Sequence, residues 1–107
     1  KLHNPEDLLL ISLATCHMLS YLAVCARLKI VVSAYEGQAE GIMAIKDKRM
    51  RFTDVVLRPR VTVAPGTDAA RAMAAHAQAH DECFIANSVN FPVHHEATIV
   101  GANDRAA

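Results

Sequence analysis

The sequence contains no tryptophan and only four glycines, four prolines and three cysteines among its 107 residues. The glycines are scattered, so no glycine-rich loop of the kind that cradles a phosphate or a dinucleotide is present. The cysteines stand far apart, at positions 16, 25 and 83, and fit neither a disulfide framework nor a four-thiolate zinc site. These absences exclude several common kinds of site and favour a reducing, cytoplasmic environment.

Neither sign of charge is in excess, because eleven basic residues balance eleven acidic ones. The two signs are interleaved along the chain, so no basic face is offered to a phosphate backbone, and nucleic acid is not an expected partner. The sequence also lacks the features of a signal peptide and an initiator methionine, so we expect further residues ahead of Lys1.

One apolar run, residues 8–26, approaches the length of a membrane span. Four polar residues interrupt it, and we therefore expect a buried helix of a soluble protein rather than contact with a membrane. Asn4 can cap this helix and Pro5 suits its first position, so the helix is predicted to run from there to about residue 28. Apolar residues occupy all its faces, which indicates that it is enclosed and suggests a partner subunit.

The length and the patterning predict one α+β domain over residues 1–107. The long central helix is expected to pack on a mostly antiparallel sheet, and Pro59 predicts an edge position or a bulge in that sheet. Turn residues and hydrophobic periodicity give the remaining elements. They are strands at 30–35, 38–46, 51–63 and 96–100, turns at 36–37 and 46–49, a helix from 67 or 68 to 80, and a short helical segment at 81–89.

Two cysteines are candidates for redox chemistry. Cys16 lies in the middle of the long helix, and Cys83 lies near the start of the short helical segment, where free amides would lower the pKa of its thiol. Asp81 and Glu82 act in the opposite direction. Two distant cysteines on packed helices are what a peroxidatic and a resolving thiol require, although the spacing does not establish that these two meet.

Two neighbours of Cys16 are predicted to be structural. Cys25 comes nine residues later, on the opposite face of the helix and about 13 Å further along it, so we expect a small buried side chain. His17 adjoins Cys16, but adjacent helical side chains point about 100° apart, which makes it a poor base for that thiol. We expect a core histidine with a hydrogen-bonded partner.

An alternative site uses metal rather than redox chemistry. His76, His80 and Cys83 fall at i, i+4 and i+7 on one helical face, and both imidazole and thiolate are zinc ligands. A fourth ligand would require His94 or His95 to return to the site. On this hypothesis the chain is a non-enzymatic, thiol- or zinc-binding dimerisation module.

Two segments together resemble the OsmC/Ohr family of osmotically inducible and organic-hydroperoxide-resistance proteins. They are NPEDLL at 4–9 leading to ATC at 14–16, and CFIANSV at 83–89. The resemblance implies an intertwined α+β homodimer with long helices in the middle and sheets outside. It also matches Cys16 to the peroxidatic cysteine, Cys83 to the resolving cysteine, and Glu6 to a glutamate ten residues ahead of the reactive thiol.

The resemblance further implies a mechanism. The Cys16 thiolate would attack an organic hydroperoxide and become a sulfenic acid, which would form a disulfide with Cys83. A dithiol, typically on a lipoylated protein, would reduce that disulfide, and no metal or other cofactor is implied. A buried apolar site would favour alkyl or fatty-acid hydroperoxides over hydrogen peroxide.

One departure from the family pattern concerns the cation beside the reactive thiol. The family uses an arginine on an N-terminal strand, paired with the glutamate that Glu6 matches, and neither that arginine nor such strands occur in residues 1–107. Arg27, Arg58 and Arg60 do not match its position. Without a cation a buried Cys16 would have a raised pKa, so an inactive member of the family is a third hypothesis. In a continuous helix Glu6 would also lie about 15 Å from Cys16.

Overall fold

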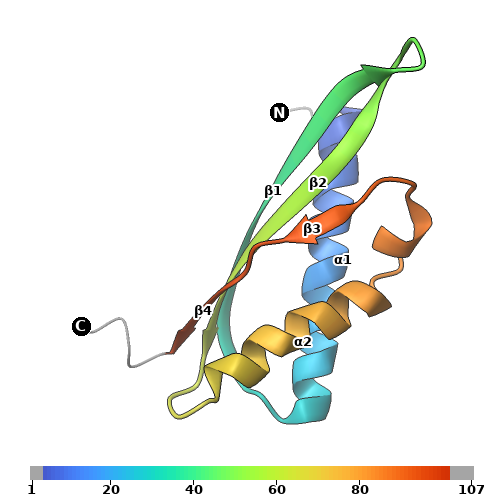
Figure 1. Cartoon of the computed structure of the whole chain (residues 1–107). Coiled ribbons are helices and arrows are strands. Elements are labelled where there is room, and N and C mark those ends of the chain that lie inside the picture. Colours follow the sequence, from blue (N-terminus) through green and yellow to red (C-terminus); the bar gives the residue numbers. More distant parts are fainter. Residues whose placement is uncertain (1–3, 102–107) are drawn as a thin grey trace.

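A computed structural model describes residues 4–101 of the chain (Figure 1). A long helix is followed by a long hairpin, a second helix, a single 3-10 turn and two short strands. In chain order the elements are α1 (Pro5–Leu28), β1 (Val32–Lys46), β2 (Arg49–Val63), α2 (Ala69–Glu82), η1 (Ala86–Ser88), β3 (Val93–His95) and β4 (Thr98–Gly101). The predicted α+β class is therefore confirmed.

Both helices begin where their capping residues predict. The Asn4 side chain accepts a 2.8 Å hydrogen bond from the amide of Asp7, and Pro5 occupies the first turn of α1. In α2 the cap is Asp68, whose carboxylate accepts from the amides of Ala70 and Arg71. The predicted extent of α1, and the start of α2 after residue 68, are confirmed.

The predicted turn at residues 36–37 is wrong, because β1 runs through it without interruption. Glu36 is paired with Arg60, and Gly37 with Pro59, in one antiparallel register with β2. The glycine interrupts the hydrophobic pattern but not the ladder of hydrogen bonds. The turn of the hairpin is instead at residues 47–48, within the segment predicted for it, where both residues have positive φ angles.

The sheet is mixed rather than mostly antiparallel, since β2 lies in its centre and pairs with β3 and β4 in parallel. Pro59 is thus not on an edge strand. It is tolerated because β3 pairs only with Val55–Leu57 and β4 only with Arg60–Val63, so the proline falls in the gap between them. The sequence identified the constraint on Pro59 but not the strand arrangement that satisfies it.

Two other predictions near the C-terminus need correction. The segment 81–89 was predicted to be helical, but after the end of α2 only residues 86–88 are, and they form the 3-10 turn η1. The last strand, predicted at 96–100, is β4 at Thr98–Gly101, and β3 at Val93–His95 was not predicted. Glu96 lies between the two strands, and its amide donates to the Leu57 carbonyl at 2.8 Å. This arrangement places His94 and His95 on β3 beside the middle of β2.

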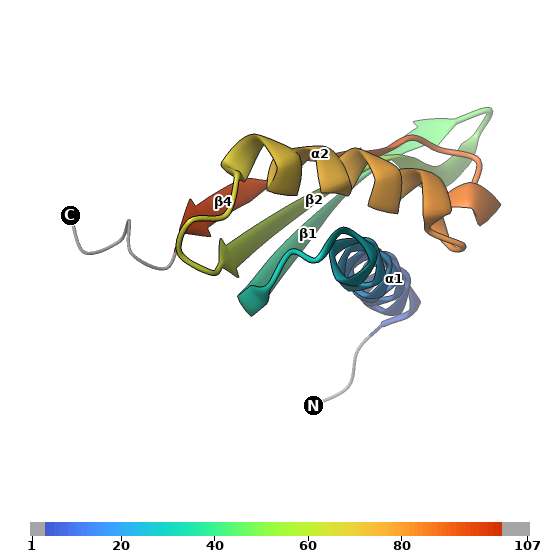
Figure 2. The ribbon, with the colours of Figure 1, turned by 90° about the horizontal axis from the view of Figure 1, so that it is seen from below.

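The two helices pack against each other and against the sheet, as Figure 2 shows in a view along α1. α2 presents three buried alanines to this packing, and their small side chains allow a close approach. Tyr21 of α1 reaches across and donates a 2.9 Å hydrogen bond to the carbonyl of Ala72. The main core cluster consists of Tyr21, Val24, Cys25, Ile30, Val61, Val63, Ala72, Ala75 and Ala79.

The single chain does not enclose α1 on all sides, so the predicted enclosure would need the partner subunit that was suggested from the sequence. Leu8, Ile11 and Leu19 are 54%, 46% and 59% exposed and follow one face of the helix. The hairpin extends past the helices (Figure 1), and the radius of gyration is 15.2 Å, against about 13 Å for a compact domain of this length. Residues 4–101 therefore leave an apolar face of α1 and apolar side chains of the hairpin exposed.

Among the helices that the structure describes, α1 is long and apolar enough to cross a membrane, judged on length and composition alone. The mean hydropathy of its most apolar window is 2.0. Core helices pass the same test, and one face of α1 is buried against α2 and the sheet.

A close contact between α1 and the hairpin gives a test of this packing. A Cβ atom at Gly41 would lie 2.5 Å from Phe52 Cε1 and 3.1 Å from Leu10 Cδ2, whereas at Gly37 the nearest atom is at 3.5 Å. We predict that Gly41→Ala lowers the free energy of unfolding by about 1–3 kcal/mol, because overpacking must displace the ring. Gly37→Ala in the same strand is the control, and equal effects in chemical denaturation would contradict the packing.

Candidate functional site

The crossing of α1 and α2 brings together the two cysteines that were predicted to react. Cys16 is partly exposed in the middle of α1, and Cys83, which is 1% exposed, caps the end of α2. Both thiols are free, and a hydrogen bond between their side chains influences the pKa of each. Cys25 lies in the core cluster, as predicted, and takes no part in this contact.

The two thiols differ in their tendency to ionise. Burial raises the pKa of Cys16, but hydrogen bonds with the backbone of Ile85 and Phe84, and with the side chains of Cys83 and Ser20, outweigh it and leave the pKa below its usual value. Burial raises the pKa of Cys83, and the hydrogen bond with Cys16 raises it further. Cys16 therefore ionises to a thiolate more readily than an ordinary cysteine, whereas Cys83 keeps its proton at neutral pH.

The donors around Cys16 come from the turn that follows α2. The Cys83 carbonyl accepts from the amide of Asn87 at 3.1 Å, and the Asn87 side chain donates to the Asp81 carbonyl at 2.9 Å. These bonds fold residues 83–87 back over α1 and direct the backbone of Phe84 and Ile85 at the thiol. Sequence reasoning singled out this segment but not Ser20, one turn after Cys16 on the same helix.

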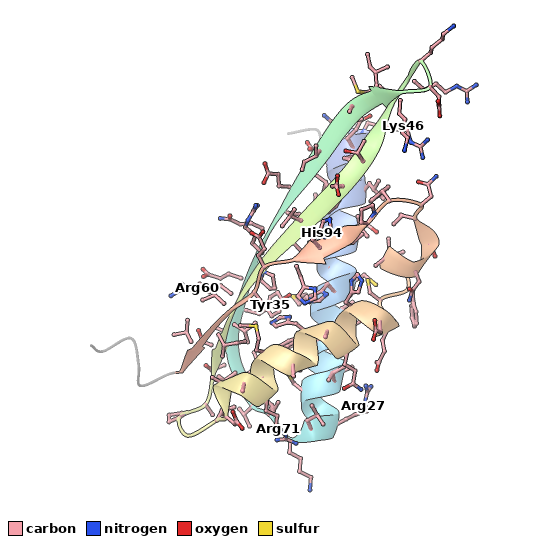
Figure 3. The ribbon with its side chains drawn as sticks, viewed as in Figure 1. Arg27, Tyr35, Lys46, Arg60, Arg71 and His94 are labelled. Atoms are coloured by element: carbon pink, nitrogen blue, oxygen red, sulfur yellow. The ribbon has the colours of Figure 1, made fainter. Side chains whose placement is uncertain are left out.

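A shallow groove of about 590 Å³ leads to Cys16. Its apolar part includes Leu19 and Phe84, and the Phe84 ring is 81% exposed. Its charged rim includes Arg27, which projects from the last turn of α1 (Figure 3) and forms a 2.7 Å ion pair with Glu82 of α2. The groove thus offers apolar surface next to a partly exposed thiol.

Of the three arginines considered as substitutes for the family cation, only Arg27 lines this groove. Arg58 forms ion pairs with Glu40 and Glu96 on the exposed side of the sheet, and Arg60 is paired in register with Glu36. None of them contributes to the lowered pKa of Cys16. In the part of the chain that the structure describes, it is hydrogen bonds with uncharged groups that lower the pKa of Cys16.

Glu6 does not join the cysteines. It lies in the helical first turn of α1, as the predicted separation of about 15 Å from Cys16 along a continuous helix requires. Its side chain lines a separate hollow with Phe52, Phe91 and basic residues of the hairpin. The role that the resemblance assigned to Glu6 stays a prediction.

The histidines form a cluster of their own. His17 is 1% exposed, and its Nε2 lies 3.0 Å from Nδ1 of His76, so the predicted core histidine with a hydrogen-bonded partner is confirmed. His95 does return to His76 and His80, with ring centroids 6.1 and 5.8 Å away. Cys83, however, faces Cys16, so the predicted zinc trio is wrong. Residues 4–101 contain no group of three or more His, Cys, Asp or Glu side chains arranged to hold a metal ion.

The structure is an α+β fold with two helices on a mixed four-stranded sheet. Where the helices cross it holds two adjacent thiols, one with a lowered pKa and one with a raised pKa. The sequence pattern of the family described as OsmC-like protein matches residues 1–98. The chain belongs to the OsmC-like family. No curated protein matches it.

Solved structures agree with this assignment. An OsmC-like protein of unknown function from Vibrio cholerae is 35% identical with a TM-score of 0.80, and the match covers 87% of this chain and 62% of the Vibrio chain. The chain therefore spans less than two thirds of that relative's length. An OsmC-like protein from Mycoplasma pneumoniae shares the fold at 15% identity with a TM-score of 0.82, and the match covers 94% of this chain and 74% of that chain.

A protein described as the organic hydroperoxide resistance protein OsmC, from Legionella pneumophila, has the same fold. It is 21% identical with a TM-score of 0.72, and the match covers 91% of this chain and 69% of that chain. At this identity the likeness shows the fold alone.

The donors around Cys16 lead to a prediction about Ser20. We expect Ser20→Ala to raise the pKa of the Cys16 thiol, because a hydrogen bond to the thiolate is lost. The measurement is the pH dependence of the rate at which iodoacetamide alkylates Cys16, read by mass spectrometry. Thr15→Ala, at an exposed position beside Cys16, is the control, and an unchanged profile in Ser20→Ala would rule out this hydrogen bond.

Proposed function

We propose that the chain is a thiol-dependent peroxidase that reduces organic hydroperoxides. The Cys16 thiolate attacks the distal oxygen of the hydroperoxide, the O–O bond breaks, and the alkoxide leaves and takes up a proton to become an alcohol. Cys16 is then a sulfenic acid, which condenses with the Cys83 thiol to give a disulfide and water. A dithiol, such as a lipoyl group on a carrier protein, returns both cysteines to thiols by exchange.

The observation that carries the proposal is the difference between the two thiols. A peroxidatic cysteine must be ionised to attack, and the pKa of Cys16 is lowered. A resolving cysteine must be adjacent and survive until the sulfenic acid forms, and Cys83 is buried beside Cys16 with a raised pKa. Membership of the OsmC-like family, and fold relatives that are named organic hydroperoxide resistance proteins, support the same assignment.

The apolar part of the groove supports an organic rather than an inorganic peroxide as substrate. Leu19 and Phe84 offer surface that an alkyl or fatty-acid chain can cover, while hydrogen peroxide gains nothing from it. We propose that binding of the substrate's alkyl or fatty-acid group in this groove places the peroxide oxygen at Cys16. A reducing compartment, the cytoplasm, is part of the proposal, since the disulfide must be reduced in each cycle.

A brief pulse of nearly stoichiometric cumene hydroperoxide tests this function. We predict a Cys16–Cys83 disulfide by mass spectrometry of the parent chain, and turnover with a dithiol that is lost by at least about 1,000-fold in Cys16→Ser. Cys83→Ser is expected to accumulate sulfenic acid on Cys16, because its resolving partner is gone. Cys25→Ser is the matched control and is expected to behave as the parent does.

Two results would contradict the proposal. Thiols left unmodified after the pulse would favour an inactive family member that depends on a cation outside residues 1–107. Faster oxidation by hydrogen peroxide than by cumene hydroperoxide would contradict the assignment of an organic substrate.

We also propose that the working unit is a homodimer in which the uncovered face of α1 is buried. This face is apolar over Leu8, Ile11 and Leu19, and the hairpin adds a second uncovered apolar surface with Ile42, Met43, Ile45 and Met50. Exposed apolar areas of this extent are typical of subunit interfaces. The extended hairpin has the length to reach over a second copy.

Light scattering tests the dimer. We expect a mass of about twice the 11.6 kDa of the chain, and we expect Ile11→Lys to shift the equilibrium towards the monomer, because a charge would be buried without a partner. Met73→Lys, at a residue of similar exposure on α2, is the control. A parent chain that remains monomeric at micromolar concentrations would contradict the proposal.

A further inference from the structure

Four imidazole rings, which we call the histidine cluster, meet where three elements join. His17 comes from α1, His76 and His80 from α2, and His95 from β3. The ring centroid of His17 lies 5.2 Å from that of His76 and 5.8 Å from that of His95. The rings of His17 and His76 are nearly parallel, with 6° between their planes, and the 3.0 Å contact between His17 Nε2 and His76 Nδ1 joins them edge to edge.

The central pair of the cluster is fully buried. His17 is 1% exposed and His76 is 0% exposed, and their hydrogen bond links α1 to α2 across 59 residues of sequence. Tyr21, also of α1, stacks on the face of the His76 ring with ring centroids 3.9 Å apart and 15° between the planes. His76 of α2 is thus held to α1 by a hydrogen bond at the edge of its ring and by an aromatic ring stacked on its face.

This arrangement requires neutral imidazoles. The bond between His17 Nε2 and His76 Nδ1 needs one nitrogen to donate and the other to accept, so it is lost when both rings carry two protons. Among residues 4–101 no group bonds to the other nitrogen of His76, Nε2, which is buried. A positive charge on this ring would therefore have no acceptor for that N–H within the described residues.

The groups that face the central pair are uncharged or of the same sign. From α1 they include Tyr21, from α2 His80, and from β3 His95, with Tyr35 of β1 behind Tyr21. Within residues 4–101 no carboxylate forms an ion pair with a ring of the cluster, while the exposed His94 does pair with Asp54 at 3.0 Å. Protonation of one ring in the cluster therefore repels protons from the others.

Burial, reinforced by the neighbouring imidazoles, lowers the pKa of His17 to about 4 and that of His76 to about 3. Both fall well below the value of about 6.5 for a histidine in water. When the helices have separated, the two imidazoles take up protons as the pH falls below about 6.5, whereas in the packed form they stay neutral until the pH is near 4. The packed form is accordingly at full stability above that pH and loses stability as the pH falls towards 4.

We propose that the histidine cluster is an acid-sensitive latch, which holds α1 against α2 at neutral pH and releases this contact when its imidazoles are protonated. The proposal goes beyond the peroxidase function, since it depends only on packing. Its effect on the cysteines is direct: Cys16 is the residue before His17 on α1, and Cys83 caps the helix that carries His76 and His80. Release of the latch therefore separates the two thiols.

Tyr21, which stacks on His76, gives an optical signal that reports on this contact. The chain has two tyrosines and no tryptophan, so the near-ultraviolet circular dichroism reports chiefly on Tyr21, which stacks on His76, and on Tyr35 beside it. In an acid titration of the full chain from pH 7.5 to 4 we expect this signal to be lost while the far-ultraviolet signal remains. Because release takes up two protons, the ratio of released to latched protein should rise by up to about 100-fold for each unit by which the pH is lowered.

A variant without one titrating group gives the decisive comparison. His76→Gln keeps an amide that can bond to His17 and removes one proton, so its transition is expected to begin at lower pH and to be less steep. His94→Gln, outside the cluster, is expected to match the parent. Equal transitions in His76→Gln and His94→Gln would overturn the proposal.

A second measurement keeps the test independent of whether the variant folds. Labelling of the parent chain with 4,4′-dithiodipyridine, which reacts with thiols in acid, is expected to reach the buried Cys83 at least about 10-fold faster at pH 4.5 than at pH 7. Nuclear magnetic resonance should show the rings of His17 and His76 protonating together with the loss of the tyrosine signal. Protonation of these two rings near pH 6.5, with the tyrosine signal and Cys83 protection intact, would exclude a latch.

Discussion

The packing of α1 against α2 is the contact on which the rest of the structure depends. Three buried alanines of α2 let the helices approach closely, and Tyr21 crosses the interface to donate to the carbonyl of Ala72. The same crossing places Cys16 beside Cys83, and His17 against His76. A change in this one interface therefore alters the core, the thiol pair and the histidine cluster together.

The chemistry of Cys16 follows from which groups the interface supplies. In the described residues no cation contributes to its lowered pKa, and the hydrogen bonds that lower it involve backbone groups of the turn after α2 and the side chains of Cys83 and Ser20. Neutral donors can hold a thiolate because they are fixed in place by folding and need no rearrangement when charge develops. Cys83 also has hydrogen bonds with the backbone of Ala86 and Ile85, but burial and the neighbouring Cys16 outweigh them and raise its pKa, which is why the proposed function assigns the attack to Cys16 and the resolving step to Cys83.

Local signals in the sequence predicted the ends of α1, the start of α2 and the hairpin turn, because capping and turn residues act over a few positions. They did not predict that β1 continues through Gly37 or that β3 and β4 run parallel to β2, because those outcomes depend on partners distant in sequence. The residues made Cys16 and Cys83 candidates for redox chemistry, a family resemblance implied their separate roles, and the fold supplied their contact. The cluster around His76 was visible only as an i, i+4 spacing, since His17 and His95 reach it from other elements.

The most direct test of this account is the equilibrium between the parent chain and glutathione at neutral pH, which gives the effective concentration of Cys16 and Cys83 for each other. Cysteines held together by helix packing should form their disulfide with little mixed disulfide to glutathione. Their effective concentration should exceed by at least about 10-fold the millimolar range typical of flexibly linked groups. Stable glutathione adducts on both cysteines, without closure of the pair, would contradict the claim that the interface holds them together for reaction.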